Sequence, residues 1–446
     1  MARSRRSSKR RTSRQAGGAT NKVLPLNQSI PLGIQHVFAM FAGNITVPLI
    51  VAGVFGVTTA EKIFLIQMAL FAAGVATIIQ TVGYKNIGSR LPIIQGTSFA
   101  FIPIMLPFKA FGLGAIFTAA FIGGIFQIWI GKMLKPIRHM FPPLVTGIVV
   151  LMIGISLLKV GFKYAGGGVW LMNNKPEIFG NWEHLLIAGT VLVVALICNI
   201  RGKGMVSAAS ILIGIIAGFV IAALLGEIRW EKIAAAGWFA FPMPFQYGID
   251  FVWGAVILML FMSIVTTIET IGDISATTMG GANREATDKE LSGGIMADGV
   301  GTAFASIFNA MPNTSYSQNA GLVAFTGVIS RHVGTVAGVI LILLGLFPKL
   351  GGIIAAMPDS VIGGAAIIMF GLIAGAGIKL ISKTEMSQRN ILILALSLSF
   401  GIGLYAFPEF VAHIPDFGIK LKLLLTTGLI PAGLLAFILN ATLPKK

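Results

Sequence analysis

The sequence predicts an all-α polytopic membrane protein with 14 transmembrane segments in two inverted seven-span repeats, and three observations support this prediction. Of 446 residues, 55% are hydrophobic and 11% are charged, against about 25% charged residues in average globular proteins. Apolar runs of spanning length recur along the chain, without the strand-like alternation of a barrel. Two runs are broken by proline and polar residues at matching places in the two halves.

The first 22 residues form a basic segment without apolar periodicity. The formal net charge is +17, and eight of the basic residues lie here: Arg3, Arg5, Arg6, Lys9, Arg10, Arg11, Arg14 and Lys22. We predict that residues 1–22 form a disordered cytoplasmic tail attracted to anionic lipid. Nucleic-acid binding is disfavoured because no aromatic residue is interleaved with the charges.

Fourteen apolar runs follow the tail. The first seven begin near Pro31, Glu61, Pro92, Gly114, Phe141, Trp182 and Ser207, and the second seven near Asp250, Leu291, Pro312, Val333, Pro358, Ser387 and Ile419. An even number of spans places both termini on one side. With the tails included, that side carries 23 Lys and Arg residues against 10 on the other. Both termini are therefore predicted to be cytoplasmic.

Small residues within the spans predict where helices approach closely. Gly214 with Gly218, and Gly371 with Gly375, each form a small-xxx-small pair. We expect both pairs to pack against neighbouring helices.

The third and tenth runs are broken. Each places prolines and polar side chains at membrane depth, in residues 91–103 and 311–321. Irregular backbone is tolerated there only where it lines a cavity or is buried in protein. The segments begin about 220 residues apart, and seven spans per repeat make the second repeat inverted, so they predict the midplane site of a secondary transporter. Proline kinks that serve packing alone are the alternative.

Three acidic residues fall inside predicted spans: Glu269, Asp273 and Asp298. A charge at the centre of a span costs on the order of 3 kcal/mol, so such residues are functional by default. Glu269 and Asp273 are four residues apart, on one face of a helix. Two carboxyl groups in a low dielectric resist simultaneous ionisation, which favours proton coupling. A hydrogen bond between helices is the alternative role for Asp273, and a structural role is the alternative for Asp298.

His36 lies in the first span, where it can relay protons or fix a facing helix; both roles stay open. The histidines and carboxylates have no metal-binding spacing, and no phosphate-loop motif occurs. We therefore expect no metal, no cofactor and no enzymatic activity.

The broken segments also carry groups suited to a flat ligand. Phe99 and Tyr316 offer ring surfaces, and the Gln318 amide places a donor beside an acceptor. Together with a carboxylate such as Glu269, this set fits a planar heterocycle such as a nucleobase. Sugars and amino acids remain alternatives, although they need no aromatic stacking.

The segment Gln318-Asn319-Ala320-Gly321, followed after four residues by Thr326, resembles the signature of the nucleobase–ascorbate transporters, the nucleobase:cation symporter-2 family. The resemblance covers nearly the whole chain after the tail and is closest to bacterial xanthine permeases. It also includes Gln35-His36, Gln95–Phe101, Val145–Gly154 and Glu269–Asp273.

The resemblance implies a core domain of spans 1–4 and 8–11, at residues 23–135 and 247–357. It implies a gate domain of spans 5–7 and 12–14, at residues 136–246 and 358–446. It further implies a proton symporter of the inner membrane and a homodimer packed through the gate domains.

The resemblance also assigns roles at matching positions. Glu269 and Gln318 would hold the base, Phe99 would pack on it, and Ser317 would add a backbone contact. Asp273, Asp298 and His36, together with Glu269, would serve proton coupling or keep the site in shape. Ala100 departs from the Asn that xanthine permeases often carry, which puts discrimination against larger purines such as urate in doubt.

The function predicted is therefore proton-coupled import of an oxidised purine, with xanthine first, by alternating access. A urate or broader purine permease is the first alternative. The second is an anion channel or exchanger on the same inverted-repeat architecture, which would favour a basic residue where this chain has carboxylates.

Overall fold

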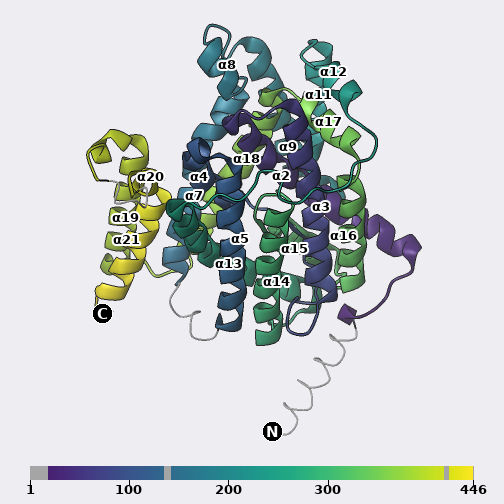
Figure 1. Ribbon diagram of the computed structural model, residues 1–446. Helices are drawn as coiled ribbons and strands as arrows, with labels where there is room; N and C mark the ends of the chain where they lie inside the picture. Colours follow the sequence, from purple (N-terminus) through teal and green to yellow (C-terminus); the bar gives the residue numbers. More distant parts are fainter. Residues whose placement is uncertain (1–18, 135–141, 416–420, 445–446) are drawn as a thin grey trace.

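The computed structural model describes residues 19–134, 142–415 and 421–444. Helices run along a common direction through most of the molecule (Figure 1). The first half contains α2 (Leu26–Phe55), α3 (Thr59–Val82), β1 (Gln95–Thr97), η1 (Phe99–Phe101), α4 (Ile102–Met105), η2 (Leu106–Phe111), α5 (Gly112–Lys132), α7 (Pro143–Ala165), α8 (Val169–Asn174), α9 (Trp182–Arg201), α10 (Met205–Ala208), α11 (Ser210–Leu224) and α12 (Trp230–Ala235).

The second half is also mainly helical. It contains α13 (Trp253–Ala282), α14 (Asp288–Ile307), β2 (Asn313–Ser315), α15 (Ser317–Thr326), α16 (Arg331–Gly345), α17 (Pro348–Ala356), α18 (Asp359–Ile381), α19 (Gln388–Ala406), η4 (Pro408–Val411), α20 (Leu421–Thr426) and α21 (Leu429–Thr442). Of the predicted tail, residues 1–18 lie outside the described residues.

The described helices confirm a multi-span helical membrane protein. Eight are long and apolar enough to cross a membrane, and the bent pair α16 and α17, which meet at 76°, would make a ninth. The helices α11 and α21 are apolar but shorter. Fourteen spans thus remain a prediction, and the starts predicted near Phe141 and Ile419 lie outside the described residues.

Helix ends follow local sequence signals. Thr58 begins α3 with a capping box to Glu61, and Thr287 begins α14 with the same box to Glu290. These side chains satisfy backbone N–H groups that the first turn leaves free. The amide of Gly56, at φ 69°, bonds back to α2 and ends that helix.

Small residues allow the closest helix pairs. A Cβ added at Gly154 would lie 2.5 Å from the Ala374 nitrogen, and one at Gly377 2.4 Å from the Leu151 nitrogen, so α7 and α18 require glycine at this crossing. Gly214 and Gly218 pack against α9, as predicted. The prediction for Gly371 and Gly375 is wrong, because an added Cβ there would meet nothing within 4 Å.

Two short strands depart from the all-helical prediction. β1 and β2 pair antiparallel, with Gly96 opposite Thr314. Beyond them the Ser98 N–H donates to the Pro312 carbonyl at 2.9 Å, and the Tyr316 N–H donates to the Ile94 carbonyl at 3.0 Å. The two broken segments therefore satisfy each other's backbone, which is what permits non-helical chain inside a membrane protein.

Candidate functional site

The broken segments meet at the centre of the candidate site. Each strand leads directly into a helical segment: β1 into η1 at Phe99, and β2 into α15 at Ser317. The Ser98 side chain accepts a hydrogen bond from the Ala100 N–H at 3.3 Å and so caps the first of these segments. Two helical N-termini thus start from one strand pair.

A threonine hydroxyl on a neighbouring helix anchors each strand. The Gln95 N–H donates to Thr77 Oγ1 of α3 at 2.9 Å. The Asn313 N–H donates to Thr302 Oγ1 of α14 at 3.2 Å, and that hydroxyl donates back to the Asn313 carbonyl at 3.0 Å. A threonine in each half therefore fixes the edge of the strand pair.

Tyr316 packs in the protein interior and is not the stacking surface that the sequence suggested. Its side chain is only 6% exposed, and its hydroxyl donates to the Thr97 carbonyl at 2.7 Å. A Cβ added at Gly43 or Gly96 would lie 2.8 Å from the ring, so glycines are needed on both sides of it. The ring faces are covered by protein and cannot hold a ligand.

The residues predicted to hold the substrate differ in exposure. Glu269 on α13, and Ser317 and Gln318 at the start of α15, are exposed. Phe99 is half-buried and meets Phe370 of α18 edge-on, with 5.7 Å between ring centroids. The accessible polar groups of the site are thus one carboxylate, one amide and one hydroxyl.

Ala100 is buried, with 6% of its surface exposed. A larger side chain at this position would have to displace the packing around η1. The structure therefore places Ala100 behind the exposed groups.

Asp273 lies one turn from Glu269 but in a different environment. It is buried, and it accepts a hydrogen bond from Ser315 Oγ of β2 at 2.7 Å. Since α13 packs along both β2 and α15, Glu269 lies within one helical turn of the β2–α15 junction. Of the two roles considered for Asp273, the hydrogen bond between elements is visible in the structure.

Asp298 is the centre of a buried hydrogen-bond network. Its carboxylate is fully buried and accepts hydrogen bonds from Gln95 Nε2 and from Thr270 Oγ1. Gln80 Nε2 also lies 3.4 Å from it. One side chain on α14 therefore connects α3, β1 and α13, directly behind the strand pair.

His36 links the first span to the signature segment. The ring is 2% exposed. Asn319 Nδ2 lies 3.0 Å from its Nδ1 and donates to the His36 carbonyl at 2.9 Å. When Asn319 donates to Nδ1, the proton of the neutral ring is on Nε2. The packing role of His36 is thus the one that the contacts support.

The remaining signature residues, Gly321 and Thr326, belong to α15. Nothing lies within 4 Å of a Cβ added at Gly321. Thr326 Oγ1 donates to the Leu322 carbonyl at 2.9 Å and accepts from the Val328 N–H at 3.3 Å. Thr326 therefore ends the helix, where Gly327 turns at φ 67°.

Sequence reasoning missed several supporting residues. Asn44 Oδ1 accepts from the Thr97 N–H at 2.8 Å, while Gln80, Thr270 and Ser315 bind the buried carboxylates. An amide within an apolar span is expensive, so Asn44 and Gln80 could have been found by that signal. The hydroxyls carried no comparable signal. Within the described residues no cluster of metal-binding side chains occurs.

Comparison with solved structures identifies the fold. The transmembrane domain of the cyanobacterial bicarbonate transporter BicA superimposes with a TM-score of 0.60 and 17% identity, over 95% of this chain and 100% of that domain. Mouse Slc26a9, an anion transporter, gives a TM-score of 0.59 and 13% identity, over 89% of this chain and 67% of that one. At these identities the likeness concerns the fold alone.

Sequence comparison identifies the family. Xanthine permease XanP of Escherichia coli is 35% identical over 436 residues, covering 95% of this chain and 93% of XanP. Uric acid permease PucJ of Bacillus subtilis is 36% identical over 412 residues, covering 92% and 91%. Residues 27–410 match the permease family that includes xanthine and uracil permeases. The chain therefore belongs to the xanthine/uracil permease family, whose members are transporters and not enzymes.

Proposed function

We propose that the protein imports an oxidised purine, with xanthine as the first candidate, and that protons drive the import. The observation that carries the proposal is the exposure of Glu269 and Gln318 beside the two helical N-termini. An amide donor and acceptor next to a carboxylate matches the adjacent N–H and C=O groups of an oxopurine. The names of XanP and PucJ support this substrate class.

We propose that Glu269 holds both the base and the transported proton. It is the exposed member of the acidic set, whereas Asp273 and Asp298 are engaged by hydroxyl and amide donors. A proton that moves with the substrate needs a carboxylate accessible to both. Asp273, Asp298 and His36 would then support coupling by keeping the strand pair in position.

The packing pattern supports the proposed fourteen spans in two inverted repeats. Between the halves α3 packs on α16 and α14 packs on α5; within the first half α9 packs on α11, and within the second half α19 packs on α21. An inverted repeat pairs these contacts one to one. The Thr77 and Thr302 anchors follow the same correspondence.

The same pattern supports the proposed domains. Within the proposed core domain, residues 23–135 and 247–357, α5 packs on α13 and α14. Within the proposed gate domain, residues 136–246 and 358–446, α7 packs on α18 and α21. We propose alternating access by movement between them in the inner membrane, with both termini cytoplasmic and two copies joined through the gate domains.

A urate permease is the second candidate function. Uric acid is named for PucJ, and this chain has Ala100 where xanthine permeases often carry the larger Asn. Anion exchange is less compatible with the site, because an anion exchanger would favour a basic residue at the broken segments, and η1 and α15 contain none.

Uptake by cells that express the protein tests the proposal. Labelled xanthine, urate, uracil and guanine are supplied with and without a protonophore. We expect xanthine or urate to accumulate and the protonophore to abolish accumulation. Accumulation that survives collapse of the proton gradient in sodium-free buffer would refute proton coupling, and transport of uracil alone would refute the substrate class.

A further inference from the structure

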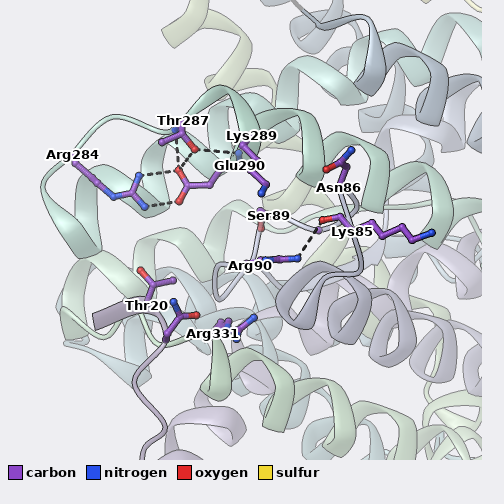
Figure 2. Close-up of a pocket in the computed structure, with 12 residues that line it drawn as sticks. Thr20, Lys85, Asn86, Ser89, Arg90, Arg284, Thr287, Lys289, Glu290 and Arg331 are labelled. Atoms are coloured by element: carbon purple, nitrogen blue, oxygen red, sulfur yellow. Dashed lines mark hydrogen bonds and ion pairs between the residues drawn. The ribbon is translucent and has the colours of Figure 1, made fainter. Parts of the chain in front are cut away.

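A cavity lies away from the strand pair, at one end of the helices. It has a volume of about 470 Å³, within the usual range for small-molecule sites. Its walls come from the loop that follows α3, the loop between α13 and α14, the start of α16, and Thr20 with Asn21 (Figure 2). We call this cavity the basic pocket.

The basic pocket carries a large excess of positive charge. Its lining includes five basic side chains and one acidic side chain, Glu290: the basic residues are Lys85, Arg90, Arg284, Lys289 and Arg331. Arg284 donates to both oxygens of Glu290, at 2.8 and 2.5 Å. Among the described lining residues, four positive charges remain without a carboxylate.

In Figure 2 Lys289 and Arg90 lie on either side of Ser89, and Arg331 lies beyond Arg90, near Thr20. The ammonium group of Lys85 lies farther out, 5.3 Å from the centroid of the Tyr84 ring. Arg90 donates one bond to the Lys85 carbonyl at 3.2 Å, and Arg331 one to the Val82 carbonyl at 3.1 Å. A guanidinium has five N–H donors, so both retain donors for a ligand.

Backbone dipoles add to this field. Glu290 and Lys289 belong to the first turn of α14, and Arg331 is the first residue of α16. The N-terminal end of a helix carries a partial positive charge. Basic residues are common at the cytoplasmic ends of spans, but these line one cavity, where a bound anion would reduce their mutual repulsion.

We propose that the basic pocket binds a phosphate-bearing anion. Guanidinium groups match the geometry of phosphate oxygens, and a lysine beside them adds a point charge. Basic pockets between membrane helices suit the phosphate of a lipid headgroup, and a soluble phosphate presents the same chemistry. None of the pocket residues belongs to the proposed substrate site, so this anion is distinct from the transported substrate.

The basic pocket is connected to the buried network. The Ser89 N–H donates to Gln80 Oε1 at 3.0 Å, and Gln80 Nε2 lies 3.4 Å from Asp298 Oδ1. Ser89 belongs to the loop that leads from α3 into β1. A bound anion therefore orders the segment that enters the strand pair.

Two binding measurements on the purified full-length protein test this proposal. They also distinguish a soluble phosphate from a lipid headgroup as the ligand. The first measures binding of inorganic phosphate to protein in phosphatidylcholine nanodiscs at constant ionic strength. The second measures by native mass spectrometry how much phosphatidylglycerol the detergent-purified protein retains relative to phosphatidylcholine. Phosphate binding identifies a soluble ligand, and selective lipid retention identifies a headgroup.

The double variant Arg90→Asn/Lys289→Gln removes two pocket charges, and Asn suits the positive φ of 58° at position 90. We expect about 25-fold weaker binding, since each of the two basic residues contributes about fivefold. The control Lys379→Gln/Lys383→Gln removes two charges outside the pocket and should bind like the wild type. The proposal is overturned if the wild type binds neither probe, or if the pocket and control variants behave alike.

Discussion

Glu269 and Asp273 occupy one face of one helix, yet only Glu269 is exposed. Exposure beside the start of α15 allows it to meet a substrate, while Asp273 is held by Ser315. We propose that Glu269 contacts the substrate and that Asp273 supports the site.

Replacing Glu269 with Gln should abolish accumulation of purine. The amide keeps the size of the side chain but cannot release a proton at any working pH, so coupling is lost even where some binding persists. Uptake against a gradient and direct binding are measured separately. The exposed loop variant Glu285→Gln is the control and should accumulate normally; active accumulation by Glu269→Gln would place the coupling group elsewhere.

Gln318 should set the choice of purine. Gln318→Glu removes the amide donor and adds a carboxylate near Glu269, so xanthine affinity should fall by roughly one to two decades, about 1–3 kcal/mol per unpaired group. Gln318→Asn keeps the amide but shortens its reach and should weaken binding less. Competition with unlabelled xanthine gives the affinities. Unchanged affinity in Gln318→Glu would mean that the amide is not a ligand.

Gly96 should not tolerate a methyl group. Its Cβ would lie 2.6 Å from Met40 Cε and 2.8 Å from Asn44 Oδ1, beside the Tyr316 ring. Gly96→Ala should therefore destabilise the protein by about 1–3 kcal/mol, seen as a lower melting temperature. Gly189→Ala on α9, where an added Cβ meets nothing within 4 Å, should be neutral or slightly stabilising. Equal melting temperatures for the two variants would contradict the tight contact.

At the scale of elements, the buried network fixes β1 against α13 and α14. Thr270→Val removes one hydrogen-bond partner of Asp298 and leaves this buried carboxyl group less satisfied. We expect a loss of about 1–3 kcal/mol in stability. In the matched control Thr190→Val, the lost hydroxyl is exposed and bonds only its own helix, at the Leu186 carbonyl. Thermal unfolding is measured for both variants. An equal loss of stability would mean that the hydrogen bond to Asp298 contributes no more than one within a single helix.

The sequence predicted the elements better than their contacts. Apolar runs located most helices, with α9 beginning at Trp182 as predicted. Prolines and polar residues located both interruptions. The strand pair could not be predicted, because three residues acquire strand geometry only from a partner about 220 residues away. The burial of Tyr316 was missed for the same reason: its pocket is formed by Gly43 on another span and Gly96 on the opposite strand.

At the scale of the molecule, the proposed domains touch next to the site. Phe99 meets Phe370 of α18, and Tyr164 of α7 donates to the Ile50 carbonyl of α2 at 2.8 Å. Relative movement of the domains must exchange these contacts. The exposed groups at the start of α15 would then be covered and uncovered in each cycle.

The most direct measurement of the central claim is protection of position 317 by substrate. Ser317→Cys is made together with Cys198→Ala, which removes the one native cysteine, and is confirmed to retain xanthine uptake. The exposed side chain should react with a maleimide, and saturating xanthine should block that reaction. A matched Ser382→Cys variant, exposed beyond the end of α18, should react equally with and without xanthine. If xanthine leaves the labelling of Ser317→Cys unchanged in an active protein, the substrate does not bind at the junction of β2 and α15.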